Sequence, residues 1–200
     1  MATPARGKLV IISGPSGAGK TTLLKRLYGC APVPLVVSVS ATTRPPRAGE
    51  IDGVDYYFLG RDEFERRRLA GEFLESCEVY RTGDWYGTLR SEVTPSLAAG
   101  KWVVLEIDVQ GTLAVLEHYP GALTIFVRPA SLAELERRLR DRGTEGEADI
   151  RRRLEVARRE LESAELYRFQ VVNDDIERAV NELRHILNPV ETERNDRGAS

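Results

Sequence analysis

Short apolar runs alternate with amphipathic segments along most of the chain. Runs rich in β-branched residues predict buried strands, at 8–13, 35–40, 102–108, 122–128 and 169–173. Segments whose apolar residues recur three and four positions apart predict helices. The predicted helices are 20–29, 91–100, 109–119, 131–143, 149–167 and 175–187. This alternation predicts an α/β fold with a mainly parallel sheet and helices on both of its faces.

Residues 41–90 have a different character. They contain several Gly, Pro and Asp residues, strand-like segments at 55–59 and 72–80, and a small helix at 61–71. We interpret them as a strand-rich subdomain inserted into a core of 8–40 and 91–188. Residues 189–200 have no apolar pattern and are expected to form a frayed tail. Residues 1–200 are therefore expected to form a single domain.

Composition narrows the possible partners and compartments. The chain has 200 residues, 42% of them hydrophobic, which suits one buried core. The formal net charge of −2 does not indicate nucleic acid as a partner. No apolar run approaches the ~18 residues of a membrane span, and no signal-peptide core is evident. Cys30 and Cys77 form no CxxC motif, so a reducing, cytoplasmic setting is expected.

The strongest local signal is the stretch SGPSGAGKTT at 13–22. Gly14, Gly19, Lys20 and Thr21 satisfy the pattern GxxxxGK[ST] between a predicted strand and a predicted helix, which is the context of a nucleoside triphosphate-binding P-loop. Glycines let the backbone turn several N–H groups toward one anion, and the helix adds its positive end. The residues expected to bind the phosphates of ATP are Gly14, Pro15, Ser16, Gly17, Ala18, Gly19, Lys20, Thr21 and Thr22. Lys20 should reach the β- and γ-phosphates, and the Thr21 hydroxyl should bind Mg²⁺.

A second anion site is indicated by Arg44 and Arg47, which are separated by two prolines. Prolines stiffen the backbone and hold the two guanidinium groups in a fixed relation, which suits a dianionic phosphate. Two solvated arginines in a turn are the alternative interpretation, and the chain is rich in arginine. The P-loop alone therefore does not identify the acceptor of the phosphoryl group.

The chain resembles the guanylate kinases, P-loop enzymes that move a phosphoryl group from ATP to GMP. The matching stretches run from residue 14 to about 175: GPSGAGKTT, SVSATTRPPRAGEIDGVDYYF, GEFLE, WYGT, LEIDVQG, RLRDRGTE and VVNDD. The Arg-Pro-Pro-Arg-Ala-Gly-Glu segment is not a general feature of P-loop proteins. The resemblance implies a P-loop NTPase-type sheet, a GMP-binding subdomain at 41–90, a small lid at about 138–153, and Mg²⁺ as the cofactor.

The resemblance also implies roles for residues of the acceptor site. Arg44, Arg47, Tyr56 and Tyr86 would hold the GMP phosphate, and Ser40, Glu75, Thr88 and Asp108 would read the guanine and its surroundings. A carboxylate such as Glu75 can accept hydrogen bonds from N1 and N2 of guanine, and a hydroxyl such as Thr88 can donate to O6. Adenine presents an acceptor at N1 and a donor at N6, so it would leave these groups unpaired. Without the resemblance, Glu75 and Thr88 would be interpreted as an ordinary strand face.

Further roles concern the donor side. Arg138, Arg142 and Arg153 would close over the ATP phosphates, and Lys20, Arg44, Arg142 and Arg153 would stabilise the transferred phosphoryl group. Arg138 could instead simply pair with Glu134 four residues earlier. Asn173 would touch the adenine, although a turn-forming Asn is an alternative. Glu106 would lie near Mg²⁺ without ligating it, and guanylate kinases often have Asp at this position.

One departure from the family pattern affects the acceptor site. The segment between Glu75 and Tyr86 is two residues longer than in many guanylate kinases, so it either extends a β-turn or shifts the register of Tyr86 and Thr88. Cys77, close to Glu75, has no assigned role. Other P-loop kinases of related fold, such as a ribose-bisphosphate kinase, and a non-catalytic phosphopeptide-binding module are alternative functions. A GTPase lacks support because the sequence has no NKxD-type segment.

Overall fold

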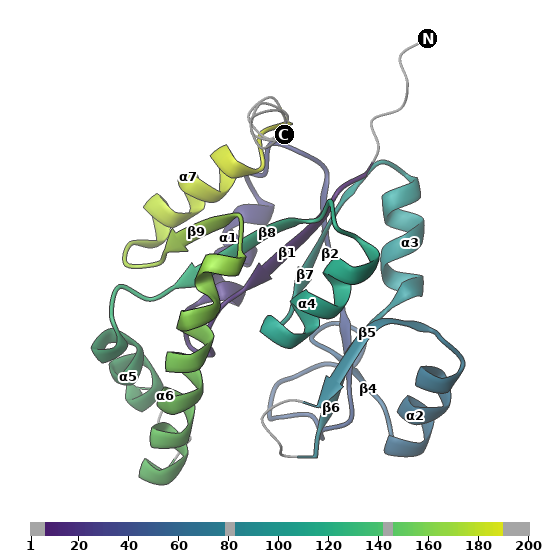
Figure 1. Cartoon of the computed structure of the whole chain (residues 1–200), viewed down its shortest axis with the longest axis horizontal. Helices are drawn as coiled ribbons and strands as arrows, with labels where there is room; N and C mark the ends of the chain where they lie inside the picture. Colours follow the sequence, from purple (N-terminus) through teal and green to yellow (C-terminus); the bar gives the residue numbers. More distant parts are fainter. Residues whose placement is uncertain (1–6, 79–82, 142–145, 190–200) are drawn as a thin grey trace. The chain divides into compact units, whose positions relative to one another are not determined.

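A computed structural model describes residues 7–78, 83–141 and 146–189 as two sheets with helices (Figure 1). The five-stranded sheet has the order β2-β7-β1-β8-β9. Its strands are β1 (Leu9–Ser13), β2 (Leu35–Val37), β7 (Trp102–Glu106), β8 (Leu123–Arg128) and β9 (Phe169–Val172). Most residues of β1, β7 and β8 are fully buried, as their apolar sequences predict. The predicted P-loop NTPase-type α/β fold is confirmed.

The helices lie close to their predicted positions. They are α1 (Lys20–Tyr28), α2 (Arg61–Leu69), α3 (Arg90–Ala98), α4 (Val109–His118), α5 (Leu132–Asp141), α6 (Glu147–Glu162) and α7 (Ile176–Ile186), with a 3-10 turn η1 (Ser163–Leu166). The N-terminus of α7 is capped by the Asp175 carboxylate, which accepts a hydrogen bond from the backbone N–H of Arg178. None of the helices in the described ranges combines the length and apolar composition needed to cross a bilayer.

Contacts between residues divide the chain into two compact units. Of the described residues, the first unit contains 7–10, 36–78, 83–105 and 110–122, and the second contains 11–35, 106–109, 123–141 and 146–189. The P-loop therefore belongs to the second unit. The Arg44–Arg47 segment belongs to the first.

The strand-rich insertion predicted for 41–90 forms the smaller sheet, which lies in the first unit. Its strands are β3 (Ser40–Thr42), β4 (Tyr57–Phe58), β5 (Phe73–Glu78) and β6 (Trp85–Leu89), in the order β4-β3-β6-β5. Phe64 of α2 stacks on Phe73 with their ring centroids 4.5 Å apart. Buried Ala41 and Leu89 complete this small core, so the sheet has apolar packing of its own.

Two predicted boundaries were wrong. The strand expected at 35–40 is divided, because β2 belongs to the large sheet and β3 pairs with β4 and β6 of the small one. Apolar periodicity cannot show that a single run serves two sheets. The helix expected to begin at residue 149 already begins at Glu147. Residues 142–145 lie outside the described ranges.

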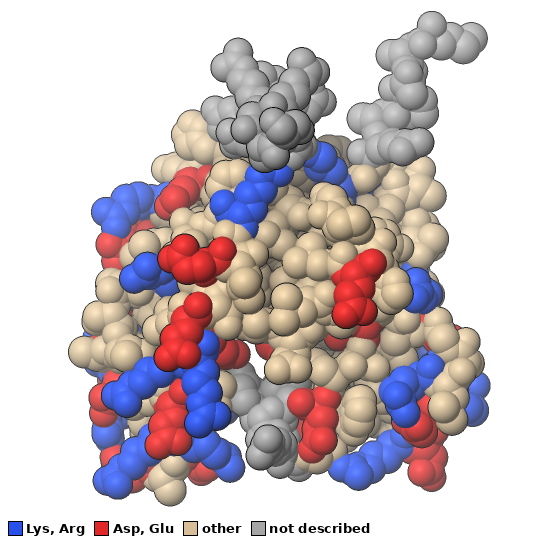
Figure 2. Space-filling model, viewed as in Figure 1, with Lys and Arg blue, Asp and Glu red and all other residues tan. Residues whose placement is uncertain are grey.

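The α5–α6 pair has a small core covered by a highly charged surface. Leu135, Leu139 and Ala157 are buried between the two helices. Acidic and basic side chains are interleaved over α6 on the visible face (Figure 2). In the two helices several charges form ion pairs three or four residues apart, such as Arg137 with Glu134 in α5 and Arg152 with Asp149 in α6. Such exposed pairs contribute little individually, so the apolar stripe dominates the packing.

Candidate functional site

The P-loop follows β1 in the second unit, and its glycines have the backbone geometry that the motif requires. Gly14 has φ of 138°, and a Cβ atom there would lie 2.0 Å from the carbonyl oxygen of Val127. Gly17 and Gly19 also have positive φ, at 94° and 90°. No side chain caps the N-terminus of α1, so its first N–H groups remain available to an anion. The loop therefore has the geometry of a phosphate cradle.

Lys20 bonds to the loop that it is expected to serve. Its Nζ donates to the carbonyl oxygens of Gly14 at 2.6 Å and Pro15 at 3.3 Å. The ammonium group is therefore held at the concave side of the loop by the backbone itself. A bound phosphate would offer it stronger, charged acceptors.

Thr21 and Glu106 are brought together from 85 positions apart in the sequence. The Thr21 hydroxyl donates to Glu106, at 3.0 Å to Oε1 and 3.2 Å to Oε2. A hydroxyl and a carboxylate are oxygen ligands of the kind that Mg²⁺ prefers. Glu106 thus lies next to Thr21, the predicted ligand of Mg²⁺, and the metal site itself stays a prediction.

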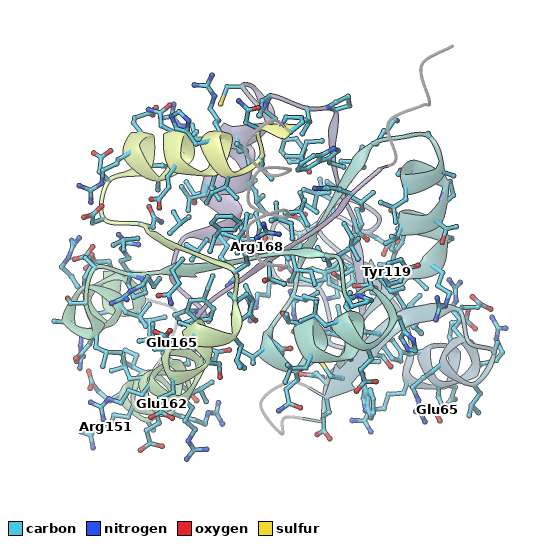
Figure 3. All side chains as sticks on the ribbon, turned by 45° about the horizontal axis from the view of Figure 1, so that its top comes forward. Glu65, Tyr119, Arg151, Glu162, Glu165 and Arg168 are labelled. Carbon is cyan, nitrogen blue, oxygen red and sulfur yellow. The ribbon has the colours of Figure 1, made fainter. Side chains whose placement is uncertain are left out.

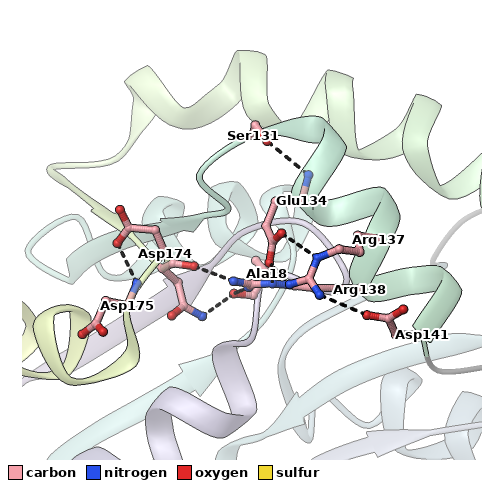
Figure 4. A network of polar contacts seen from close by, with 9 residues as sticks. Ala18, Ser131, Glu134, Arg137, Arg138, Asp141, Asp174 and Asp175 are labelled. Atoms are coloured by element: carbon pink, nitrogen blue, oxygen red, sulfur yellow. Dashed lines mark hydrogen bonds and ion pairs between the residues drawn. The ribbon is translucent and has the colours of Figure 1, made fainter.

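Arg138 and Asn173 both donate to the carbonyl oxygen of Ala18 in the P-loop. Figure 4 shows Arg138 beside Ala18. Asn173 is buried, and its Nδ2 donates to the Ala18 oxygen at 2.7 Å. Arg138 donates to the same oxygen at 3.4 Å, to the Asn173 carbonyl at 2.9 Å and to Glu134 at 2.9 Å. The Glu134–Arg138 pair foreseen from the helical spacing thus coexists with contacts to the P-loop. The contacts of Asn173 with adenine and of Arg138 with ATP stay predictions.

Of the other two predicted lid arginines, the structure describes Arg153 but not Arg142. Arg153 of α6 lies beside the P-loop, where its Nη1 donates to the Ser16 hydroxyl at 3.4 Å. Arg142 lies outside the described residues. Arg137 and Arg140 form ion pairs with neighbouring acids on the surface of α5.

Glu160 of α6 is a half-buried acid of the second unit that the sequence interpretation did not single out. Its Oε2 is fully enclosed and has no hydrogen-bond partner among the described residues. Burial raises the pKa of Glu160 to about 7, an effect that the charge of Lys20 opposes and that of Asp108 reinforces. The carboxyl group thus shares an electrostatic environment with the P-loop lysine.

We expect Glu160 to make the stability of the chain depend on pH. The folded state keeps this proton up to about pH 7, whereas the unfolded chain releases it near the ordinary glutamate pKa of 4.5, so stability falls as the pH rises between the two. Glu160→Gln should abolish this loss, which amounts to about 3 kcal/mol at most. Urea unfolding at pH 5 and pH 8 measures it, and the variant should gain relative stability only at pH 8.

Glu162→Gln provides the matched control for this experiment. Glu162 is exposed on the same helix and points away from the core (Figure 3). The control should leave the difference between the two pH values as in the wild type. A stability difference between Glu160→Gln and wild type that is equal at both pH values would contradict the expectation.

The first unit contains the Arg44 cluster. Arg44 is only 8% exposed, and its guanidinium lies over the rings of Tyr56 and Phe58, at 4.9 and 5.6 Å from their centroids. Its Nε donates to the Tyr86 hydroxyl at 3.0 Å. Nη1 and Nη2 donate to the two carboxylate oxygens of Glu50, at 2.7 and 2.8 Å. The hydrogen-bonded pairing raises the pKa of Arg44 above its usual value and lowers the pKa of Glu50 to about 2, so both groups are charged.

Three of the predicted phosphate-binding residues meet at this cluster. Tyr56 and Tyr86 pack edge to face with centroids 5.9 Å apart, and both contact Arg44. The Arg47 backbone N–H donates to Glu50 at 2.7 Å, while the Arg47 side chain is exposed. Tyr57 lies against the small core and donates its hydroxyl to Glu92 at 2.8 Å.

The predicted base-reading residues of the first unit are paired across the small sheet. Thr88 lies opposite Ser40 on β3 and opposite Glu75 on β5. Glu75 and Thr88 are buried, and the Thr88 hydroxyl donates to Glu75 at 2.7 Å. The hydroxyl proton expected at O6 of guanine is therefore directed at Glu75 in this structure. Asp108 belongs to the second unit, and its part in reading guanine stays a prediction.

The longer segment before Tyr86 does not displace these residues. β5 and β6 pair with Glu75 opposite Thr88, Cys77 opposite Tyr86 and Glu78 opposite Trp85. An irregularity of the ladder lies between Phe73 and Glu75, on the far side from the turn. The turn residues 79–82 are outside the described ranges. The register shift that the sequence left open at Tyr86 and Thr88 is therefore absent from the described part of the hairpin.

The comparisons with known proteins agree with one another. The guanylate kinase family model matches residues 6–190. A curated guanylate kinase from Rhodopirellula baltica is 55% identical over 183 residues, which is 90% of this chain and 87% of that protein. One from Nostoc sp. is 47% identical, over 92% of this chain and 91% of the relative. The crystal structure of guanylate kinase from Anaplasma phagocytophilum matches with a TM-score of 0.75 and 32% identity, covering 94% of this chain and 87% of that one. The chain therefore belongs to the guanylate kinase family.

Proposed function

We propose that this chain transfers the γ-phosphoryl group of ATP to GMP and releases ADP and GDP. The observation that carries the proposal is the pairing, in one family member, of an intact P-loop with the buried Glu75–Thr88 pair and the Arg44 cluster. The P-loop would hold the phosphates of ATP. The Glu75–Thr88 pair suits a guanine base, and the Arg44 cluster suits a monophosphate. A degraded P-loop would instead favour a binding module.

The acceptor oxygen of GMP is already anionic, so the reaction needs no strong general base. The protein would contribute alignment and neutralisation of charge. Lys20 and the P-loop N–H groups would hold the donor phosphates, while Arg44, Arg47 and the two tyrosine hydroxyls would hold the acceptor. Mg²⁺, when bound at Thr21 with Glu106 beside it, would neutralise charge on the β- and γ-phosphate oxygens.

Closure of the segment at about 138–153 over the ATP phosphates is part of the same proposal. Arg138 and Arg153 contact the P-loop at Ala18 and Ser16. A shift of these side chains by the length of a hydrogen bond would bring positive charge to a bound phosphate and exclude water.

We also propose that the enzyme acts in the cytoplasm, since the thiols of Cys30 and Cys77 suit a reducing compartment.

A panel of acceptors tests the proposed function. ADP release from Mg-ATP would be followed with GMP, dGMP, AMP, UMP and a ribose bisphosphate. We expect GMP and dGMP to be used, and AMP and UMP to be about 10³-fold poorer in kcat/KM, because a buried carboxylate rejects bases that leave it unpaired. Preferential use of a ribose bisphosphate, or no turnover with any acceptor, would contradict the proposal.

A further inference from the structure

The side chain of Glu50 contacts both arginines expected to bind the GMP phosphate, although the sequence analysis assigned it no role. Its two carboxylate oxygens accept from both terminal nitrogens of Arg44, and Oε2 also accepts from the backbone N–H of Arg47. Glu50 therefore ties together the two arginines that flank Pro45 and Pro46. The segment from 44 to 50 is closed into a loop by this one side chain.

The donors of Arg44 are almost all used in this arrangement. A guanidinium has five N–H groups. Glu50 takes two, Tyr86 takes the one on Nε, and the Pro45 carbonyl oxygen takes one on Nη1 at 3.0 Å. One N–H on Nη2 remains for a ligand. Hydrogen bonds thus hold the Arg44 guanidinium on three sides in its own plane, and two aromatic rings lie against its face.

Two roles for Glu50 are compatible with a phosphate-binding cluster. It could act as a placeholder, leaving Arg44 when the phosphate arrives. Alternatively, Glu50 could stay paired and hold the Arg44 guanidinium in place. The remaining N–H of Arg44 would then bind the phosphate without a further loss of side-chain entropy. Departure would break the bond to the Arg47 backbone as well as both bonds to a buried guanidinium, which favours the second role.

We infer that Glu50 is a positioning residue of the acceptor site, which fixes the Arg44 guanidinium and the Arg44–Arg47 loop for the phosphate of the substrate and stays paired with Arg44 when that phosphate binds. The inference rests on the proposed function, because it takes the phosphate to be that of GMP. It predicts that Glu50 acts on binding of the phosphate, and not on binding of the base or of ATP.

Glu50→Gln tests the inference. The amide has one acceptor and no charge, so it can no longer take both terminal nitrogens of Arg44. We expect KM for GMP to rise about 10- to 100-fold, as is common for residues that orient a ligand-binding side chain. KM for ATP should stay within about twofold, and the inhibition constant of guanosine, which has no phosphate, should stay unchanged.

Glu65→Gln serves as the matched control. Glu65 of α2 forms a bidentate pair with Arg68 in the same unit, with both N–O distances at 2.7 Å, and lies on the exposed face of its helix (Figure 3). This variant should behave as wild type with GMP. Thermal unfolding of both variants identifies any general loss of the fold.

The outcomes separate the inference from the proposed function. If wild type does not use GMP, the proposed function fails. If wild type uses GMP and Glu50→Gln binds it more tightly, Glu50 is a placeholder and the inference is overturned. Equal weakening of GMP and guanosine binding would also overturn it, because that result indicates general disturbance of the subdomain.

Discussion

Glu75→Gln should lower kcat/KM for GMP by about 10³-fold, because a buried group that loses its hydrogen-bond partners costs far more than an exposed one. Glu75 is only 7% exposed, and its Oε1 is held by the Thr88 hydroxyl at 2.7 Å. The carboxylate is therefore fixed in direction and would accept from N1–H and N2–H of guanine. The substituted amide would place its NH₂ group against one of these donors.

The discrimination between bases provides a sharper readout than the loss of activity alone. The amide NH₂ can donate to N1 of adenine, so the ratio of kcat/KM for GMP to that for AMP should fall. KM for ATP should not change. Steady-state assays with both acceptors at saturating Mg-ATP give these values.

Glu78→Gln is the matched control, since Glu78 lies on the same strand and is exposed. It should retain the rate and base preference of wild type. Loss of GMP and ATP use in equal proportion by Glu75→Gln would contradict its role as the reader of guanine. Unchanged base preference would contradict it as well.

The sequence was informative where backbone geometry is dictated by residue type. At Gly14 the conformation and the approach of Val127 exclude any side chain, so the glycines, together with Lys20 and Thr21, made the P-loop predictable. The buried strands β1, β7 and β8 followed from continuous apolar runs. The division of 35–40 between two sheets could not be predicted, because it depends on which strands lie next to each half.

The candidate site could be predicted only in part, because ion pairs and burial are properties of the fold. Glu50 lies within the quoted Arg-Pro-Pro-Arg-Ala-Gly-Glu segment, yet nothing in its spacing shows that it would pair with Arg44 instead of solvent. The sequence contains only a weak indication that Glu160 faces the interior. Glu160 lies three residues after buried Ala157 and four before buried Ala164, so it is an acid on the apolar face of a helix. Such a position indicates either a buried partner or a shifted pKa.

Lys20→Met should lower kcat by about 10³-fold or more, the scale seen when a cation that neutralises a transferring phosphoryl group is removed. Methionine keeps the length and apolar stem of the side chain and removes the charge. In this structure the Lys20 ammonium is held by the carbonyl oxygens of Gly14 and Pro15, so it lies at the P-loop, where the phosphates of ATP are expected. The effect on KM for ATP should be smaller, because the P-loop N–H groups remain.

Lys25→Met is the matched control for the same helix. Lys25 is exposed in the last turn of α1, and its replacement should leave kcat unchanged. Unfolding adds an independent readout, because the charge of Lys20 lowers the pKa of Glu160, which burial raises. Lys20→Met should therefore shift the pH-dependent loss of stability due to Glu160 toward higher pH. A variant that keeps kcat within tenfold of wild type would show that the P-loop backbone carries the transferred charge without the lysine.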